Sequence, residues 1–432
     1  MATVGSAVGL GNIWRFPYQA GENGGGAFLL TYALAVLLIG IPAMVAEFIV
    51  GRESHLNAVG AFKKIAPKKA WGGIGYLGVF TGFMIDCYYC VVTGWTLYYL
   101  FLAASDNLLG LSVDQYSIMF STYSSGVFPP IFALVSVILI TGVIVSLGVQ
   151  KGIETASKIM MPLLFLLLLA LAVNSCLLED SQTGLEFLFI PNWSEFTIDT
   201  ILSAIGQAFF SLSLGMACLV TYSSYFTDDV NLIGTASKIS VIDMGVAVLA
   251  GVIIFPAVFT FGMEPEQGPG LVFKVLPNVF SQMPLGYLWS LLFYALLFLA
   301  ALTSFISITE VVVAYISEAF KISRVKSVIL TGLTFTLLGS VCSLSFGPLS
   351  GFTIAGKNIF DSLDYLATNI LLPLGGILTS IFVGWRLDKK VIEKQLNIKG
   401  KKGAAFLKVY IFFLRYIVPA SVTCVLVTGL LS

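Results

Sequence analysis

The sequence predicts an all-α membrane protein of about eleven transmembrane helices, built as two inverted five-helix repeats in which helices 1 and 6 are broken. Three observations support this prediction. Of the 432 residues, 57% are hydrophobic and only 11% are charged, whereas soluble domains have about 25% charged residues. Apolar runs of about 20 residues, long enough to cross a bilayer core of about 30 Å, recur along the chain. Two of these runs, five spans apart, are interrupted by glycines and polar residues.

The apolar runs place the expected spans at 1–22, 27–51, 72–104, 128–148, 152–177, 197–226, 232–263, 285–320, 326–345, 358–385 and 404–431. Lysines and arginines are concentrated in alternate loops, such as 52–69 and 386–402, and the intervening loops carry mainly acidic residues. Positive loops favour the cytoplasmic side of a membrane. We therefore expect a multi-pass protein of the plasma (inner) membrane with a cytoplasmic N-terminus.

The first span contains Gly5, Gly9 and Gly11 beside Asn12 and Arg15. Irregular backbone is tolerated at membrane depth only where it lines a cavity or a polar ligand, because lipid cannot satisfy its hydrogen bonds. A glycine-interrupted membrane helix therefore indicates a binding site, as in transporters with discontinuous helices. The alternative is a Gly-xxx-Gly packing surface, which does not explain the two polar side chains.

The sixth span has a similar interruption over 206–216, with Gln207, Ser211 and Ser213 among the glycines. An offset of five spans divides the chain into a first repeat, 1–177, a second and inverted repeat, 197–385, and an additional helix, 404–432. Where two such breaks meet, free carbonyl groups suit cations and free N–H groups suit an anion. In the eighth span, Thr303 and Ser304 place two hydroxyl groups side by side. Such hydroxyls supply hard oxygen ligands for an alkali cation or bond back to a carbonyl of their own helix.

Other classes of function are disfavoured. The formal charge is zero and no basic patch is interleaved with aromatic residues, so we expect no nucleic-acid partner; no obligate protein partner is evident either. His55 is the single histidine, and the six cysteines lack zinc-ligand spacing. Because no nucleophile–base pair or metal cluster appears, we do not expect an enzyme.

The motifs at these positions closely resemble the neurotransmitter:sodium symporter family, in particular its bacterial eleven-helix branch. The resemblance covers the whole chain and is carried by 5–17, 22–28, 40–52, 88–89, 207–215, 268–273 and 300–304. It implies a sodium-coupled symporter that imports neutral hydrophobic or aromatic amino acids by alternating access. The alternatives are a sodium-coupled carrier of another small zwitterion or osmolyte, and a non-transporting amino-acid receptor on the same fold.

The resemblance also implies two sodium sites and a gate. The first sodium site comprises Ala7, Asn12, Ser211 and Asp243 together with the substrate carboxylate, and the second comprises Gly5, Val8, Ala300, Thr303 and Ser304. Arg15 and Asp364 are expected to form an outer gate, above a lid of Tyr89 and Phe210; Asp364 is otherwise an ordinary acid at a helix start.

The implied substrate pocket has a carboxylate end and an ammonium end. Its expected residues are Ser6, Ala7, Leu10, Gly11, Ile85, Tyr89, Phe210, Ser211, Ser213, Met216, Ser304 and Ile308. The carboxylate is expected at the N–H groups near Leu10 and Gly11, with Tyr89 as a further donor. Gly9 stands where monoamine carriers of the family have an aspartate, which favours an amino acid over an amine.

Asp243 resembles a carboxylate that many bacterial members of the family have, whereas Asp86 and the chain start depart from the family pattern. Asp243 is expected at the span-seven sodium ligand or, one turn away, at the position that substitutes for chloride; in either case transport should not require chloride. The alternative is a protonated acid bonded to a neighbouring helix. Asp86 is expected to bond a helix group, to bind a polar substrate group such as a phenol, or to relay a proton. The family's cytoplasmic Arg-Trp stretch has no counterpart here, so either the N-terminus is truncated or the inner gate differs, and Glu318 then lacks its usual cation.

Overall fold

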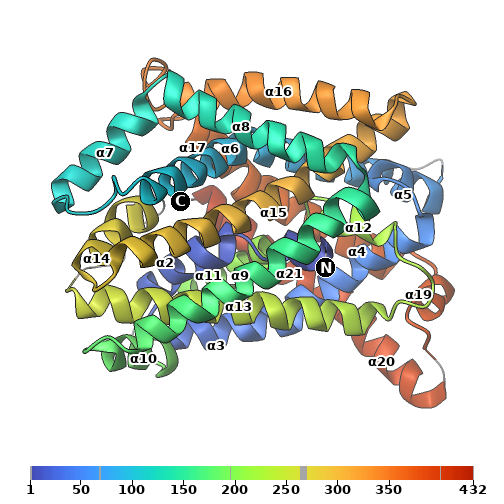
Figure 1. Cartoon of the computed structure of the whole chain (residues 1–432). Helices are drawn as coiled ribbons and strands as arrows, with labels where there is room; N and C mark the ends of the chain where they lie inside the picture. The colour runs from blue at the N-terminus through green and yellow to red at the C-terminus, as the bar shows by residue number, and fades with distance from the viewer. Residues whose placement is uncertain (1, 68–69, 195, 263–269, 399, 432) are drawn as a thin grey trace.

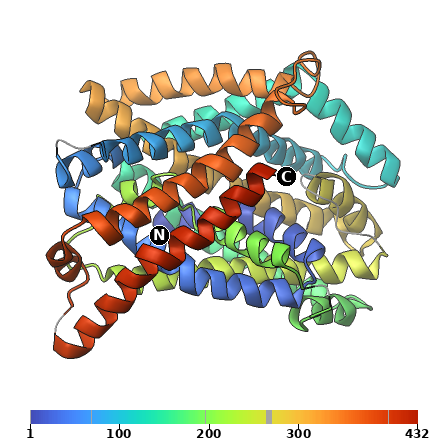
Figure 2. The same cartoon turned by 180° about the vertical axis from the view of Figure 1, so that it is seen from behind.

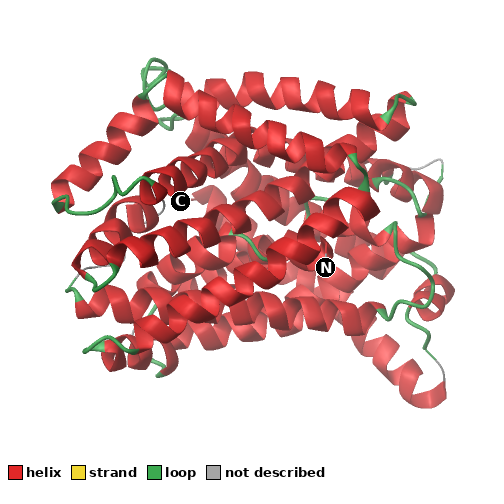
Figure 3. Ribbon diagram, viewed as in Figure 1, coloured by secondary structure: helices red, strands yellow, loops and turns green. Residues whose placement is uncertain are grey.

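The computed structural model describes residues 2–67, 70–194, 196–262, 270–398 and 400–431. Figure 3 shows that these residues form helices joined by short loops. Strand-like pairing in the described ranges is limited to two isolated bridges, Gly25 with Pro191 and Ile354 with Lys357. The all-α class expected from the apolar runs is confirmed.

The helices of the eleven expected spans begin and end within a few residues of the expected limits, save the seventh, whose last expected residue, 263, lies outside the described residues. They are α1 Ala2–Ala7, η1 Gly11–Arg15 and α2 Phe16–Glu22; α3 Gly26–Ala35, η2 Val36–Gly40 and α4 Ile41–Ser54; α6 Gly72–Ala104; α8 Phe128–Ser146; η3 Val149–Glu154 and α9 Thr155–Cys176; α11 Ile198–Ser211 and α12 Cys218–Ser223; α13 Leu232–Thr260; α15 Gly286–Phe320; α16 Arg324–Leu344; α17 Ile359–Tyr365, η5 Leu366–Leu371, α18 Leu372–Ile381 and η6 Phe382–Arg386; and α20 Gly400–Phe412, η7 Phe413–Ile417 and α21 Val418–Leu431. The elements labelled η are π-helical turns within longer helices.

Nine helices in the described part of the chain are long and apolar enough to cross a membrane. The first and sixth expected spans are not among these nine, because both are interrupted near their middle: α1 ends at Ala7 and α11 ends at Ser211. The broken helices 1 and 6 are therefore present as expected. The division into inverted repeats stays a prediction.

Short helices connect the spans at the two ends of the bundle. They are α5 Ala58–Ile65, α7 Val113–Ser125, α10 Ser181–Phe189, η4 Leu271–Val275, α14 Leu276–Gln282 and α19 Lys389–Gln395. In Figure 1, α5 and α19 lie at one end and α7, α10 and α14 at the other, and the view from behind in Figure 2 agrees. The two longest helices, α6 and α15, pack along each other through the interior, which places their side chains next to the two breaks.

Candidate functional site

The two interrupted helices face each other in the centre of the bundle. The Gln207 side chain donates a hydrogen bond of 2.8 Å to the carbonyl of Gly11. The Ser213 hydroxyl donates one of 2.8 Å to the carbonyl of Ser6. Side chains of the sixth helix thus bond backbone carbonyl groups on both sides of the break in the first helix. Such contacts satisfy polar backbone groups that lipid could not.

The sixth helix is unwound over residues 212–217, and a buried acid holds this segment. Its backbone is left-handed at Ser213, Gly215 and Ala217, with φ of +55°, +81° and +62°. A Cβ atom at Gly215 would lie 2.3 Å from the carbonyl oxygen of Leu372, so the close approach requires glycine. Glu47 of α4 accepts a 2.8 Å hydrogen bond from the backbone N–H of Gly215, and this contact fixes the unwound chain against its neighbour.

A cavity lies between the two breaks, and all twelve residues expected in the substrate pocket line it. Its lining is Ser6, Ala7, Gly9, Leu10, Gly11, Ile85, Tyr89, Phe210, Ser211, Ser213, Met216, Ser304 and Ile308. The cavity volume is about 30 Å³, enough for a water molecule but not for an amino acid. An amino acid therefore enters this site only if the lining side chains move apart.

Phe210 lies at one wall of the cavity, and Arg15 covers it. The guanidinium carbon of Arg15 is 4.5 Å from the centroid of the Phe210 ring, a cation–π contact. Asp364 is close enough to Arg15 to interact with its charge. Both side chains belong to the described part of the chain, and no direct ion pair joins them. The hydroxyl of Tyr89 contacts Ser304 and the backbone N–H of Leu10, the group expected to receive a substrate carboxylate.

The expected residues of the first sodium site form one buried hydrogen-bond cluster. The Asn12 amide donates to Asp243 Oδ1 at 2.7 Å and to the Ser211 hydroxyl at 3.0 Å. Ser211 is 2.8 and 2.7 Å from the two carboxylate oxygens of Asp243. The Asn12 carbonyl oxygen accepts from the backbone N–H of Gly9 at 3.0 Å. Asp243 and Asn12 have no exposed surface, so a full negative charge here calls for a cation. Ala7, the remaining expected ligand, lies in the adjoining cavity wall.

The expected residues of the second sodium site also converge, between α1 and α15. The hydroxyls of Thr303 and Ser304 each lie 3.5 Å from the carbonyl oxygen of Val8. Thr303 also donates to the carbonyl of Ala300 at 3.0 Å, the back-bonding that adjacent hydroxyls allow. A Cβ atom built at Gly5 would be 3.8 Å from that of Thr303. These oxygens are the hard ligands that an alkali cation prefers.

At Gly9 there is no room for a side chain. A Cβ atom there would lie 2.2 Å from the hydroxyl oxygen of Ser304 and 3.7 Å from the carbonyl oxygen of Ala300. Any larger residue at this position would displace Ser304. The absence of a side chain thus joins the cavity to the second set of oxygens.

Sequence reasoning missed the role of Tyr32. Its hydroxyl donates to Asp243 Oδ2 at 2.9 Å and lies 3.3 Å from the Ser211 hydroxyl. Tyr32 sits in the apolar run of the second span with no polar neighbour at helical spacing, so the sequence carried no signal for it. The roles of Glu47 and Gln207 were missed too, although both are polar residues in apolar segments, within the family-like stretches 40–52 and 207–215.

Asp86 is buried beside the cavity and bonds to α15. Its Oδ2 accepts a 2.9 Å hydrogen bond from the Thr309 hydroxyl, and it has no exposed surface. Asp86 follows Ile85, and Thr309 follows Ile308, but neither Asp86 nor Thr309 lines the cavity. The bond joins the two long central helices directly behind the lining residues.

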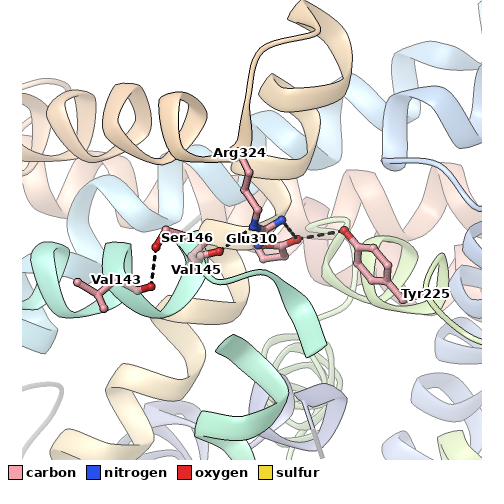
Figure 4. Close-up of polar contacts among 6 residues, drawn as sticks. All are labelled: Val143, Val145, Ser146, Tyr225, Glu310 and Arg324. Carbon is pink, nitrogen blue, oxygen red and sulfur yellow. Dashed lines mark hydrogen bonds and ion pairs between the residues drawn. The ribbon is translucent and has the colours of Figure 1, made fainter. Parts of the chain in front are cut away.

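Another buried acid, Glu310, organises the end of the bundle near α5 and is drawn in Figure 4. The guanidinium of Arg324 pairs with both carboxylate oxygens of Glu310 and donates to the carbonyl of Val145 at 2.7 Å. Tyr225 donates to the same carboxylate at 3.1 Å. Glu310 has no exposed surface. This cluster joins α15 to the last turn of α8, to the first residue of α16, and to Tyr225, two residues after the end of α12.

Glu318, expected to lack its usual cation, has a neutral partner here. Its carboxylate accepts hydrogen bonds from the backbone N–H and the side-chain amide of Asn57, at 3.0 and 2.6 Å. Asn57 in turn caps α5 by accepting from the backbone N–H groups of Val59 and Gly60. Glu318 therefore anchors the first turn of α5 to the end of α15.

Comparisons with known proteins agree on one family. The chain matches the family model described as sodium:neurotransmitter symporter family over residues 1–119 and 121–432. It is 42% identical to an uncharacterized sodium-dependent transporter, YhdH, of Bacillus subtilis, over 100% of this chain and 96% of that protein. It is 36% identical to an uncharacterized sodium-dependent transporter of Haemophilus influenzae, with the same coverage of 100% and 96%. Among solved structures, it is similar to MhsT in complex with L-phenylalanine, with a TM-score of 0.91, 44% identity, and coverage of 99% of this chain and 97% of that chain.

Proposed function

The chain belongs to the sodium:neurotransmitter symporter family and is a sodium-dependent symporter, and on this basis we propose that it imports neutral hydrophobic or aromatic amino acids. The family is one of transporters, which implies that the chain is not an enzyme. The observation that supports this substrate class best is the cavity between the two interrupted helices, which is lined by all twelve expected residues.

The chemistry of the cavity fits an amino acid with an apolar side chain. At one side, the backbone N–H of Leu10 and the hydroxyl of Tyr89 lie together and suit a carboxylate. At the other, Ile85, Met216 and Ile308 offer apolar surface, of which the Met is the most adaptable. No acid lines the cavity among the described residues, which disfavours amines that lack a carboxylate. MhsT, 44% identical to this chain, binds L-phenylalanine.

We propose that two sodium ions are cosubstrates at the two oxygen clusters. The first ion would lie at Asn12, Ser211 and Asp243, whose side chains already contact one another. For the Asn12 carbonyl oxygen to face the ion, the amide would turn from its present bond with Gly9. The second ion would replace the weak 3.5 Å contacts between the hydroxyls of α15 and the Val8 carbonyl.

Asp243 supports the proposal that transport does not need chloride. A carboxylate at the first cluster supplies a fixed negative charge next to the cation, and uncompensated charge in a buried site is very costly. A chloride ion would therefore not be needed to balance the charge of the sodium ion in such a site.

Alternating access would run between the two ends of the bundle. On the proposed outer side, Phe210 and Arg15 close the cavity, and the Arg15–Asp364 pair would form when the site closes over substrate. Charged pairs of this kind open readily, because water competes for both partners. The end that carries α5 and α19 has most of the lysines and arginines, which supports a cytoplasmic position for that end and for the N-terminus. The repeats 1–177 and 197–385 would rock against each other.

The test is uptake by the purified chain in proteoliposomes with an inward sodium gradient. Labelled leucine, phenylalanine, tyrosine and tryptophan should accumulate above the external concentration, and collapse of the gradient should abolish accumulation. Proline betaine and other zwitterions without a free ammonium should not compete. Binding without accumulation would identify a receptor instead, and competition by osmolytes alone would identify the osmolyte carrier.

A further inference from the structure

A second cavity lies at the end of the bundle that carries α5 and α19. Its volume is about 360 Å³, within the range of about 300–1,000 Å³ that is usual for ligand sites. It is lined by Ile65, Ala66, Phe382, Arg386, Leu387, Asp388 and Val391. It is separate from the central cavity and shares no residue with it.

The ends of two helices and the start of a third form this cavity. Helix α5 finishes at Ile65, η6 finishes at Arg386, and α19 starts at Lys389 after its cap residue Asp388. Phe382 packs at a ring distance of 5.0 Å on Phe62 and holds the first two segments together. Ile65, Phe382 and Val391 give the cavity an apolar wall, opposite in character to the charged Arg386 and Asp388 in the same lining.

The mouth of the cavity carries unpaired positive charge. Arg386 lines the cavity, and Lys389 and Lys390 directly follow the lining residue Asp388. All three are exposed, and their side chains have no hydrogen-bond or ion-pair partner among the described residues. Asp388, the acid among them, accepts from the backbone N–H of Lys390 as the helix cap. By contrast, Lys394 one turn further on is paired with Glu53.

Neighbouring aromatic residues place this mouth at the level of lipid headgroups. Trp385 is 55% exposed, and the guanidinium of Arg415 lies 4.9 Å from the centroid of its ring. Tyr416 packs edge-on against the same ring at 5.7 Å. Exposed Trp and Tyr beside cations are typical of the boundary between the hydrocarbon core and water.

We propose that this cavity binds the headgroup of an anionic phospholipid, with the phosphate at Arg386, Lys389 and Lys390 and the glycerol region against the apolar walls. Basic pockets between membrane helices at the cytoplasmic face suit such headgroups. A soluble phosphate would meet the same cations but would leave the apolar walls uncovered. The bound lipid would tie α19 to the loop that contains α5, and both of these contact the end of α4.

The experiment uses the full chain in a neutral detergent and follows its thermal unfolding during titration with dioleoylphosphatidylglycerol. Dioleoylphosphatidylcholine and inorganic phosphate are titrated in parallel. The phosphatidylglycerol should raise the midpoint of unfolding at concentrations where the other two have no effect. In the triple variant Arg386→Gln, Lys389→Gln, Lys390→Gln, the concentration that gives half of this shift should increase about tenfold or more, because each cation near a lipid surface contributes to binding.

A matched variant, Lys238→Gln, Lys321→Gln, Lys326→Gln, removes the same charge from exposed positions outside the cavity and should behave as wild type. Val391→Trp fills the cavity while keeping all three cations, and it should also weaken the lipid effect. An equal loss in the matched variant would overturn the proposal in favour of general surface charge. An equal effect of inorganic phosphate, or of phosphatidylcholine, would overturn it as well.

Discussion

Replacing Asp243 by Asn removes the charge at the first proposed sodium site and keeps the shape of the side chain. The carboxylate now accepts from Asn12 at 2.7 Å, from Ser211 at 2.7 and 2.8 Å, and from Tyr32 at 2.9 Å. In the Asn variant, the amide nitrogen can face Tyr32 or Ser211, whose hydroxyls turn to accept a hydrogen bond. The variant should therefore fold, and its defect should lie in sodium binding.

The expected weakening of sodium binding follows from the lost attraction between the Asp243 carboxylate and the sodium ion. Two unit charges about 4 Å apart attract by about 4 kcal/mol at an effective dielectric constant of 20. Desolvation of the carboxylate cancels a part of this; with about half remaining, the loss of about 2 kcal/mol corresponds to a roughly 30-fold higher sodium requirement. Asp199→Asn, with the same charge change at an exposed position in the first turn of α11, is the control.

The assay is the sodium dependence of uptake by proteoliposomes in chloride and in gluconate. Wild type and the Asp199 variant should be indifferent to the anion. The Asp243→Asn variant should lose activity, or regain a part of it only in chloride, because a diffusible anion can then occupy the uncharged site. A wild type that depends on chloride, or a fully active Asn variant that is indifferent to it, would refute the reasoning.

The remaining predictions concern the other cluster, the cavity wall and the buried acid beside it. Thr303→Ala and Ser304→Ala should each raise the sodium concentration for half-maximal uptake while the chain stays folded; unchanged sodium dependence in both would remove them from the second site. Met216→Phe should shift the leucine-to-tryptophan uptake ratio toward leucine by about tenfold, since a methylene-sized contact is worth about 1–3 kcal/mol; a shift within about twofold would place Met216 outside the substrate contact. Asp86→Asn keeps an acceptor for Thr309 and should leave the tyrosine-to-phenylalanine ratio unchanged, whereas Asp86→Ala should lower the midpoint of thermal unfolding by leaving a buried donor unpaired. A tenfold fall of that ratio in the Asn variant would show instead that Asp86 receives the substrate's phenol.

The fold class and the positions of the two breaks were predictable because the bilayer constrains them strongly. Lipid tolerates a polar, glycine-rich interruption of an apolar run only where the interruption is buried in protein or lines a cavity. The sequence of 5–12 and 206–216 therefore identifies the centre of the molecule. Span limits followed from the lengths of the apolar runs, as with α6, which begins and ends at the expected residues 72 and 104.

Contacts that depend on the relative rotation of helices were not predictable in the same way. Tyr32 reaches Asp243 because α3 and α13 present particular faces to each other. The sequence of a uniformly apolar helix does not indicate which face it turns toward its neighbour. The π-helical turns, such as η2 at Val36–Gly40, carry no sequence signature either. The distance between Arg15 and Asp364 is a property of one conformation, so the sequence indicated the pair but not that the two side chains would lie apart here.

The shared residues of the site explain how sodium and substrate can depend on each other. Ser304 lines the cavity and belongs to the second oxygen cluster, and Ser211 lines the cavity and bonds Asp243 in the first. Gly9 completes the link, because a side chain there would push Ser304 out of position. An ion that reorders either serine thus reshapes the wall that a substrate meets, and by reciprocal linkage a substrate that fixes this wall tightens the ion sites by the same factor. With a cavity of about 30 Å³, the wall has to move for an amino acid to bind, so ions at the two proposed sites would control when substrate can bind.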